Sequence, residues 1–157
     1  MGHCSGTTIG SRSRYGTGLG GHDSDHETTT KKFGMADRFD YLEGDVLGAN
    51  LGTGYDIATL GHILHTEGQE RSQQLLKRVF RALKSGGAVA IGEWLVNDAR
   101  TAPPNGLIFA VNMLVHSEQG DTFSFNEIKR WLEEAGFKKV RKLAAPGPSP
   151  LILATKP

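Results

Sequence analysis

The chain has 157 residues, which is enough for one domain with a hydrophobic core and too few for two. Its 18 Lys and Arg against 17 Asp and Glu leave a net charge of +1, so composition gives no reason to expect nucleic acid or an anionic membrane as a partner. A single cysteine excludes an internal disulfide framework, and apolar stretches too short for a bilayer span or a signal peptide lead us to expect a soluble, cytoplasmic protein.

Residues 1–34 differ in composition from the rest. They hold eight of the 21 glycines and ten Ser or Thr, with very few large apolar side chains, so we predict an irregular segment here and one α/β domain over residues 35–157. Residues 2–6 have the outline of a nucleophile elbow centred on Cys4, as in ester and thioester hydrolases, although no strand precedes them. Residues 22–27 are rich in metal-ligand types but lack a rigid frame, and we expect no metal site. A change of reading frame would also account for the switch in composition.

The first half of the α/β domain alternates short apolar runs with one amphipathic pattern. Residues 39–43 predict a strand that ends at Gly44-Asp45, and residues 55–60 predict a more buried strand that ends at Gly61. Apolar residues then recur at helical spacing over residues 70–83, before Gly86-Gly87. Residues 88–93 predict a strand of small residues with Glu93 at its carboxyl end.

The second half predicts two helices and a hairpin. Residues 103–116 begin with Pro-Pro and place five apolar residues on one stripe: Leu107, Ile108, Val111, Leu114 and Val115. Ser124 and Glu127 form a capping box that opens a helix over residues 125–135. Residues 138–143 and 151–155 predict two antiparallel strands. The order indicates an α/β fold with a mostly parallel sheet, a C-terminal antiparallel hairpin and helices on both faces.

Acidic residues follow two of the predicted strands. In an open parallel sheet, ligands bind at the carboxyl ends of the strands, so Asp45, the turn at residues 61–65 and Glu93 are expected to line one crevice. The alternative is that Asp45 and Glu93 are exposed strand-end acids and that His65 only begins a helix.

Several segments, read in order, resemble a known family. They include Arg-Phe-Asp-Tyr-Leu-Glu-Gly-Asp at 38–45, His-Ile-Leu-His at 62–65, Ala-Leu-Lys-Ser-Gly-Gly at 82–87, Asn-Met-Leu-Val-His at 112–116 and Glu-Ala-Gly-Phe at 134–137. From residue 33 onward the chain resembles the C-terminal half of class I S-adenosylmethionine-dependent O-methyltransferases of the hydroxyindole and caffeate type. The resemblance implies a partial Rossmann-like methyltransferase sheet. On this resemblance, we expect the family's first strand, its Gly-rich turn and its N-terminal dimerisation domain to be missing.

The resemblance assigns roles to five residues near the cofactor and the base. Asp45, with Val46 beside it, matches the acid that contacts the adenosine of S-adenosylmethionine, and Gly61 stands where the family has a Lys near the cofactor. His65 matches the general base, and Glu93 matches the acid that holds its imidazole. A neutral imidazole oriented by a carboxylate is suited to take a hydroxyl proton near neutral pH.

The resemblance also places an acceptor pocket. Asn112, Met113 and His116 match the helix that walls it, so a small phenolic or enolic hydroxyl is the expected methyl acceptor. Four positions depart from the family pattern: Thr66 stands for the Asp after the base, Glu67 for the aromatic residue that follows it, Gly61 for the Lys near the cofactor, and Thr122 for a second acid. Two other hypotheses stay open, namely a non-catalytic remnant of the fold that forms a homo-oligomer or binds a small molecule, and a small ester hydrolase.

Overall fold

The computed structural model describes residues 6–10, 28, 31–34, 45–145 and 149–157. Its main feature is a five-stranded sheet with the order β1-β2-β3-β7-β6. The strands are β1 (Gly6–Gly10), β2 (Tyr55–Gly61), β3 (Leu83–Gly92), β6 (Lys138–Leu143) and β7 (Leu151–Thr155). The strand expected at residues 39–43 lies outside the described residues, as does most of the segment 1–34. Within that segment, however, β1 forms a regular strand on the free edge of β2.

The sheet is mixed. Only the β2–β3 pair is parallel among its described strands, whereas β1–β2, β3–β7 and β6–β7 are antiparallel. The C-terminal hairpin is confirmed, with Leu143 opposite Leu151. The α/β class is therefore confirmed, but the described part is less parallel than expected, because the hairpin and β1 together supply three antiparallel pairings.

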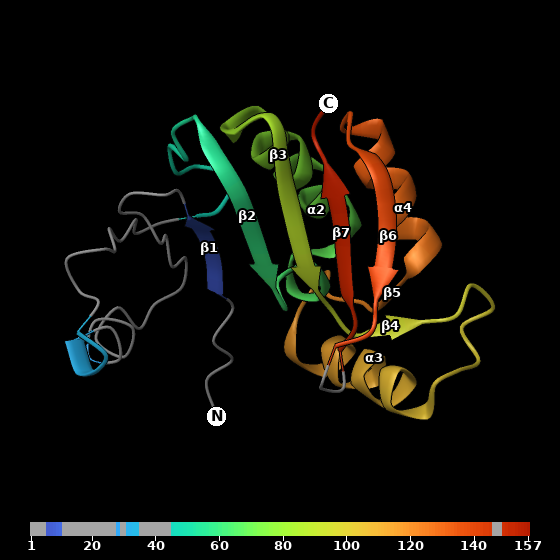
Figure 1. Cartoon of the computed structure of the whole chain (residues 1–157). Helices are drawn as coiled ribbons and strands as arrows, with labels where there is room; N and C mark the ends of the chain where they lie inside the picture. Colours follow the sequence, from blue (N-terminus) through green and yellow to red (C-terminus); the bar gives the residue numbers. More distant parts are fainter. Residues whose placement is uncertain (1–5, 11–27, 29–30, 35–44, 146–148) are drawn as a thin grey trace.

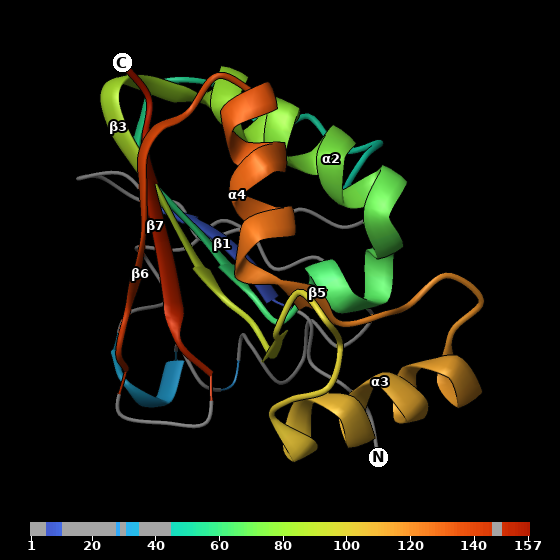
Figure 2. The same ribbon diagram turned by 90° about the vertical axis from the view of Figure 1, so that its right-hand side faces the viewer.

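Two helices, α2 (Leu64–Ala82) and α4 (Phe125–Glu134), pack on the same face of the sheet (Figures 1 and 2). Their buried side chains meet those of the strands in one core that includes Leu75, Leu76, Val89, Trp131 and Ile152. Helices on both faces were expected, and in the described part of the chain these two lie on one face. On the opposite face of the sheet, the apolar side chains of Ile57, Leu143 and Leu151 stay exposed. None of the described helices is long and apolar enough to cross a membrane.

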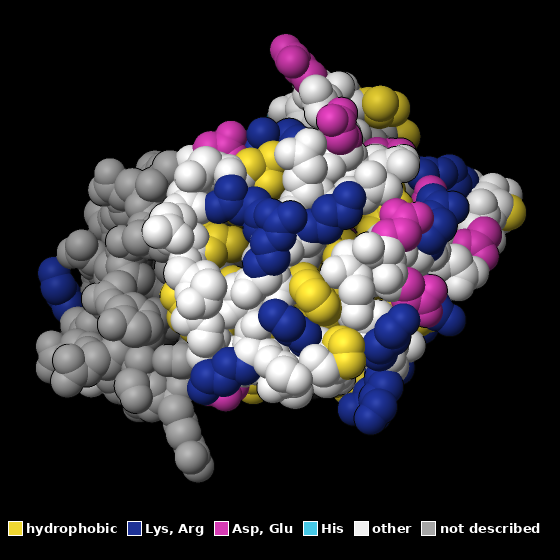
Figure 3. All heavy atoms as spheres, turned by 90° about the horizontal axis from the view of Figure 1, so that it is seen from above, with side chains coloured by type: hydrophobic (Ala, Val, Ile, Leu, Met, Phe, Trp, Pro, Cys, Tyr) yellow, Lys and Arg dark blue, Asp and Glu magenta, His cyan; other side chains and the backbone are white. Residues whose placement is uncertain are grey.

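The helix α4 forms as its capping box predicts. Ser124 Oγ accepts a hydrogen bond from the backbone N–H of Glu127 at 3.2 Å, and Glu127 Oε2 accepts one from the N–H of Ser124 at 2.7 Å. The helix α2 begins six residues before the expected start, and it is interrupted at Gly68, whose φ of 72° lies outside the helical region. At the sheet edge where β2 and β3 begin, the surface carries many Lys and Arg side chains (Figure 3).

The carboxyl ends of β2 and β3 meet the remaining elements. There β4 (Leu95–Val96) pairs in parallel with β5 (Phe123–Ser124), and α3 (Pro104–His116) lies below the sheet (Figure 2). The apolar stripe of α3 does not face the core. Its members Ile108, Val111, Leu114 and Val115 are all exposed, and only Gly106 and Met113 of this helix are buried.

Candidate functional site

The carboxylate of Glu93 lies directly after β3 and is completely buried. Its Oε2 accepts hydrogen bonds from the backbone N–H groups of Leu64 at 3.1 Å and His65 at 3.4 Å, and its Oε1 accepts one from the N–H of Trp94 at 2.9 Å. Leu64 and His65 open α2, and the first N–H groups of a helix have no partner within the helix. Glu93 therefore caps α2 from another strand, 29 residues away along the chain.

His65 pairs with the same carboxylate. Its Nδ1 lies 2.6 Å from Glu93 Oε1, and only 2% of its side chain is exposed. A carboxylate accepts hydrogen bonds and does not donate them, so Nδ1 carries a proton, and the neutral form of this imidazole has its lone pair on Nε2. The parallel pairing of β2 with β3 produces this contact, because it places Gly61 opposite Gly92 and brings the two strand ends together.

Aromatic rings pack against the imidazole. The Phe109 ring of α3 meets the His65 ring edge-on with centroids 4.8 Å apart, and the Trp94 ring stacks on Phe109 at 5.4 Å. Phe109 thus ties α3 to the histidine. The sequence analysis missed it, although Phe109 stands four residues before Met113 and so shares its face of the helix.

His62 completes a cluster with His65 and Glu93. Its Nδ1 lies 3.8 Å from Glu93 Oε1, and 43% of its side chain is exposed. Its φ of 54° is left-handed, which is uncommon for a residue other than glycine. Its N–H donates to the carbonyl of Gly92 at 2.9 Å.

Asp45 lies apart from this cluster and contacts another part of α2. Its Oδ1 accepts hydrogen bonds from Arg71 at 2.8 Å and from the N–H of Leu47 at 2.7 Å, and Arg71 also donates to Glu67 at 2.6 Å. The hydrogen bond from the Arg71 guanidinium, aided by that from Leu47, lowers the pKa of Asp45. Val46, beside it, is buried. The structure thus presents an ionised, exposed carboxylate held by a cation.

The residues expected to wall the acceptor pocket lie on α3. Met113 is buried, His116 is exposed, and the Nδ1 of His116 lies 2.9 Å from the carbonyl oxygen of Asn112. Thr122, in place of the family's second acid, is buried, and its Oγ1 has no hydrogen-bond partner in the part of the chain that the structure describes. Cys4, the centre of the possible elbow, lies outside the described residues.

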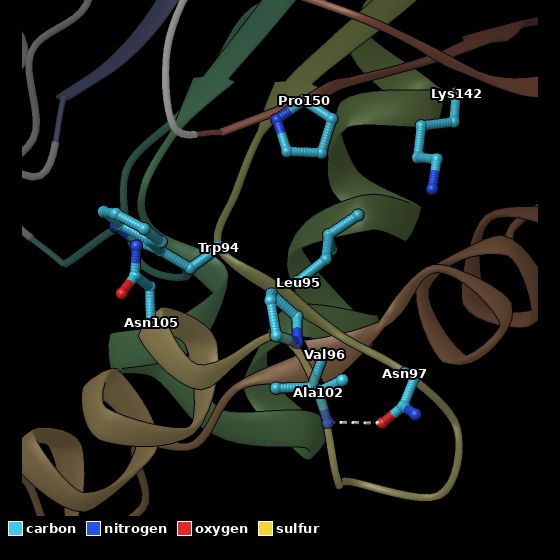
Figure 4. A pocket seen from close by; sticks show the side chains of 9 residues that line it. Trp94, Leu95, Val96, Asn97, Ala102, Asn105, Lys142 and Pro150 are labelled. Carbon is cyan, nitrogen blue, oxygen red and sulfur yellow. Dashed lines mark hydrogen bonds between the residues drawn. The ribbon is translucent and has the colours of Figure 1, made fainter.

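A pocket of about 520 Å³ opens at the same edge of the sheet (Figure 4). It lies among β4, the start of α3, the end of β6 and the start of β7, and Trp94, which stacks on Phe109, forms part of its lining. Its lining is mostly apolar, with Lys142 as its charged member, and includes Leu95, Val96, Pro103 and Pro150. Asn112, Met113 and His116 are not among its lining residues.

A family model described as the O-methyltransferase domain matches residues 25–138. Among curated proteins, the tetracenomycin polyketide synthesis 8-O-methyl transferase of Streptomyces glaucescens is 37% identical over 102 residues, which are 65% of this chain and 30% of that protein. Acetylserotonin O-methyltransferase of Bos taurus is 32% identical over 120 residues, which are 76% of this chain and 34% of that protein. The chain spans about a third of the length of these relatives.

Solved structures share the fold. The structure of PigF with SAH superposes with a TM-score of 0.80 at 28% identity and covers 92% of this chain and 48% of that chain. The human N-acetylserotonin methyltransferase in complex with SAM gives a TM-score of 0.71 at 26% identity, covering 82% and 37% of the two chains.

Proposed function

Since the chain belongs to the O-methyltransferase family, we propose that it takes part in S-adenosylmethionine-dependent O-methyl transfer, with His65 as general base and Glu93 orienting its ring. The observation that carries the proposal is the buried contact of 2.6 Å between His65 Nδ1 and Glu93 Oε1. A small phenol or enol is the proposed acceptor, because such a hydroxyl must lose its proton as it attacks a methyl group.

When bound, S-adenosylmethionine supplies an electrophilic methyl group on a sulfonium. His65 Nε2 accepts the hydroxyl proton of the acceptor, and its ring becomes positively charged. Glu93 keeps the proton on Nδ1, and its negative charge stabilises the imidazolium that forms. Phe109 and Trp94 limit the access of water to the ring, which strengthens this electrostatic interaction.

Asp45, Val46 and Gly61 are proposed to hold the adenosine part of the cofactor. The ionised carboxylate of Asp45 is a hydrogen-bond acceptor for nucleoside hydroxyl or amino groups, and Arg71 fixes its position. Asn112, Met113 and His116 are proposed to contact the acceptor from α3, where Met113 offers a buried apolar surface next to the exposed His116.

Two measurements test this proposal. Calorimetric titration with S-adenosylmethionine and S-adenosylhomocysteine should show binding that Asp45→Ala weakens, and that the matched surface change Asp56→Ala leaves unchanged. In methyl-transfer assays with phenolic acceptors, His65→Ala should lower kcat by about 10²- to 10⁴-fold while cofactor binding persists. Unchanged activity in His65→Ala would remove this residue from the mechanism, and no binding at millimolar cofactor would refute the cofactor site.

The exposed apolar surface supports a second function, self-association without catalysis. Ile108, Val111, Leu114 and Val115 form a continuous stripe on α3, and a stripe of this kind is a surface that proteins usually bury against a partner. We propose a second copy of the chain as that partner. Sedimentation should show a dimer or larger species that Leu114→Asp dissociates, and a monomer at all concentrations would contradict the idea.

A further inference from the structure

We propose that His62, His65 and Glu93 form a binding site for Zn²⁺. One potential ligand atom from each of the three side chains lies within 4.8 Å of the others. Two imidazoles and one carboxylate are a ligand set that zinc accepts, and three protein ligands leave a fourth position of the tetrahedron for water. The spacing of the three residues in the sequence did not indicate this site, because Glu93 comes from another strand.

The distances are close to those of a coordinated ion. In a tetrahedral site with metal–ligand bonds of about 2.1 Å, neighbouring ligand atoms are about 3.4 Å apart. The Nδ1 of His62 lies 3.8 Å from Glu93 Oε1, and the Nδ1 of His65 lies 2.6 Å from the same oxygen. An ion therefore requires that the His65 contact open and the His62 contact close by less than an ångström. The ligand atoms of the two imidazoles, which lie within 4.8 Å of one another, must also approach by up to about 1.4 Å, and rotation of the exposed His62 side chain provides this movement.

The carboxylate is already fixed for ligation. Three backbone N–H groups, from Leu64, His65 and Trp94, hold Glu93 in place, and second-shell hydrogen bonds of this kind orient ligands in metal sites. The side of the cluster formed by His62 is 43% exposed, so an ion can reach the two buried ligands from solvent.

The backbone at His62 directs its ring toward Glu93. The left-handed φ of 54° is held by the hydrogen bond from its N–H to the Gly92 carbonyl, on the strand that delivers Glu93. A left-handed conformation at a residue other than glycine carries an energetic cost that the surrounding structure must compensate. Such residues concentrate at functional sites, and here the conformation brings a second imidazole to a carboxylate that already has one.

Binding of zinc would block the proposed base. The ion takes the lone pair of His65 Nδ1, so the single N–H proton of the neutral ring moves, by exchange with solvent, from Nδ1 to Nε2. His65 in this form has no lone pair with which to accept a hydroxyl proton. Inhibition by zinc therefore rests on the proposed function, whereas binding of the metal does not.

The test is a titration of the whole chain with Co²⁺, whose visible absorption reports tetrahedral coordination, followed by competition with Zn²⁺. We expect one strong site per chain. His62→Asn removes the ligand while Asn tolerates the left-handed backbone, and it should weaken binding by at least about tenfold, as even the loss of an outer-shell partner does. The control His22→Ala/His26→Ala removes two other potential ligands in residues 22–27, and it should keep the absorption band.

Each outcome is decisive for the site. An unchanged Co²⁺ spectrum in His62→Asn, loss of the band in the control, or no strong binding would overturn the proposal. Circular dichroism verifies that His62→Asn is folded, and a rise in the thermal midpoint on adding Zn²⁺, in the wild type but not in this variant, gives a second measurement. These readouts hold whether or not the chain transfers methyl groups. If it does, Zn²⁺ should inhibit the wild type more strongly than His62→Asn.

Discussion

Replacing Glu93 by Gln should destabilise the fold as well as the site. The carboxylate accepts four hydrogen bonds, from the backbone N–H groups of Leu64, His65 and Trp94 and from His65 Nδ1. An amide of the same shape has only one oxygen. In one orientation this oxygen faces the N–H groups of Leu64 and His65, and the NH₂ group points at the N–H of Trp94. In the other orientation the oxygen faces Trp94, and the NH₂ group points at the first N–H groups of α2.

Either orientation leaves at least one buried N–H without an acceptor. An unsatisfied buried donor costs about 1–3 kcal/mol, so we expect Glu93→Gln to lower the free energy of unfolding by that amount. The first orientation also places an amide donor against His65 Nδ1. This favours the imidazole with its proton on Nε2, which cannot act as a base.

Urea unfolding, followed by circular dichroism and by tryptophan fluorescence, measures the loss of stability. The ¹⁵N shifts of the His65 ring identify the nitrogen that carries the proton. The matched control is Asp56→Asn, because Asp56 forms an exposed ion pair with Lys84, and such pairs contribute between zero and about 1 kcal/mol. A loss below about 0.5 kcal/mol in Glu93→Gln, the range of ordinary surface changes, would refute the capping role.

Three further predictions concern α2 and α4. Arg71→Gln should raise the pKa of Asp45 toward the ordinary aspartate value, as measured by carbon NMR titration, because the guanidinium hydrogen bond lowers it. The ion pair of Asp45 with Arg71 stabilises the folded state fully above the pKa that Asp45 has in the unfolded chain. This stabilisation is lost as the pH falls through the lower pKa that Asp45 has in the folded state. Gly68→Ala should destabilise the fold by about 1–3 kcal/mol in urea unfolding, because φ at Gly68 is 72° and a Cβ there would lie 2.5 Å from a carbonyl oxygen. Gly48→Ala is the control and should be near neutral, because the nearest atom to its Cβ would lie at 3.6 Å. Ser124→Ala should cost about 1 kcal/mol in the same assay through loss of the helix cap.

Local patterns predicted those elements whose signals lie within a few residues. The capping box at Ser124 predicted the start of α4, and the Pro- and Gly-rich residues between 143 and 151 separated the two strands β6 and β7. The start of α2 was missed because its cap is Glu93, which no local pattern connects to Leu64. The apolar stripe of α3 indicated a helix correctly but did not indicate that the stripe is exposed, because periodicity identifies a face without its partner.

The candidate site could be predicted only in part. Acids at strand ends and the family resemblance brought His65 and Glu93 into one hypothesis, and the structure places them in contact. The residues that contact His65 and Asp45 could be identified only from the three-dimensional structure. Phe109 reaches His65 from α3, and Arg71 reaches Asp45 across 26 residues of sequence. Neither contact follows from spacing, since both depend on how the elements pack.

The cap that Glu93 provides has a consequence for how homologous sequences are interpreted. One carboxylate both begins α2 and orients an imidazole, so a chain that lost its chemistry would still be under selection to keep this acid for folding. The imidazole of His65 takes no part in this cap, to which His65 contributes only its backbone N–H. Among homologues, substitutions at His65 therefore indicate that catalysis has been lost. A retained Glu93 indicates only that the start of α2 is still capped.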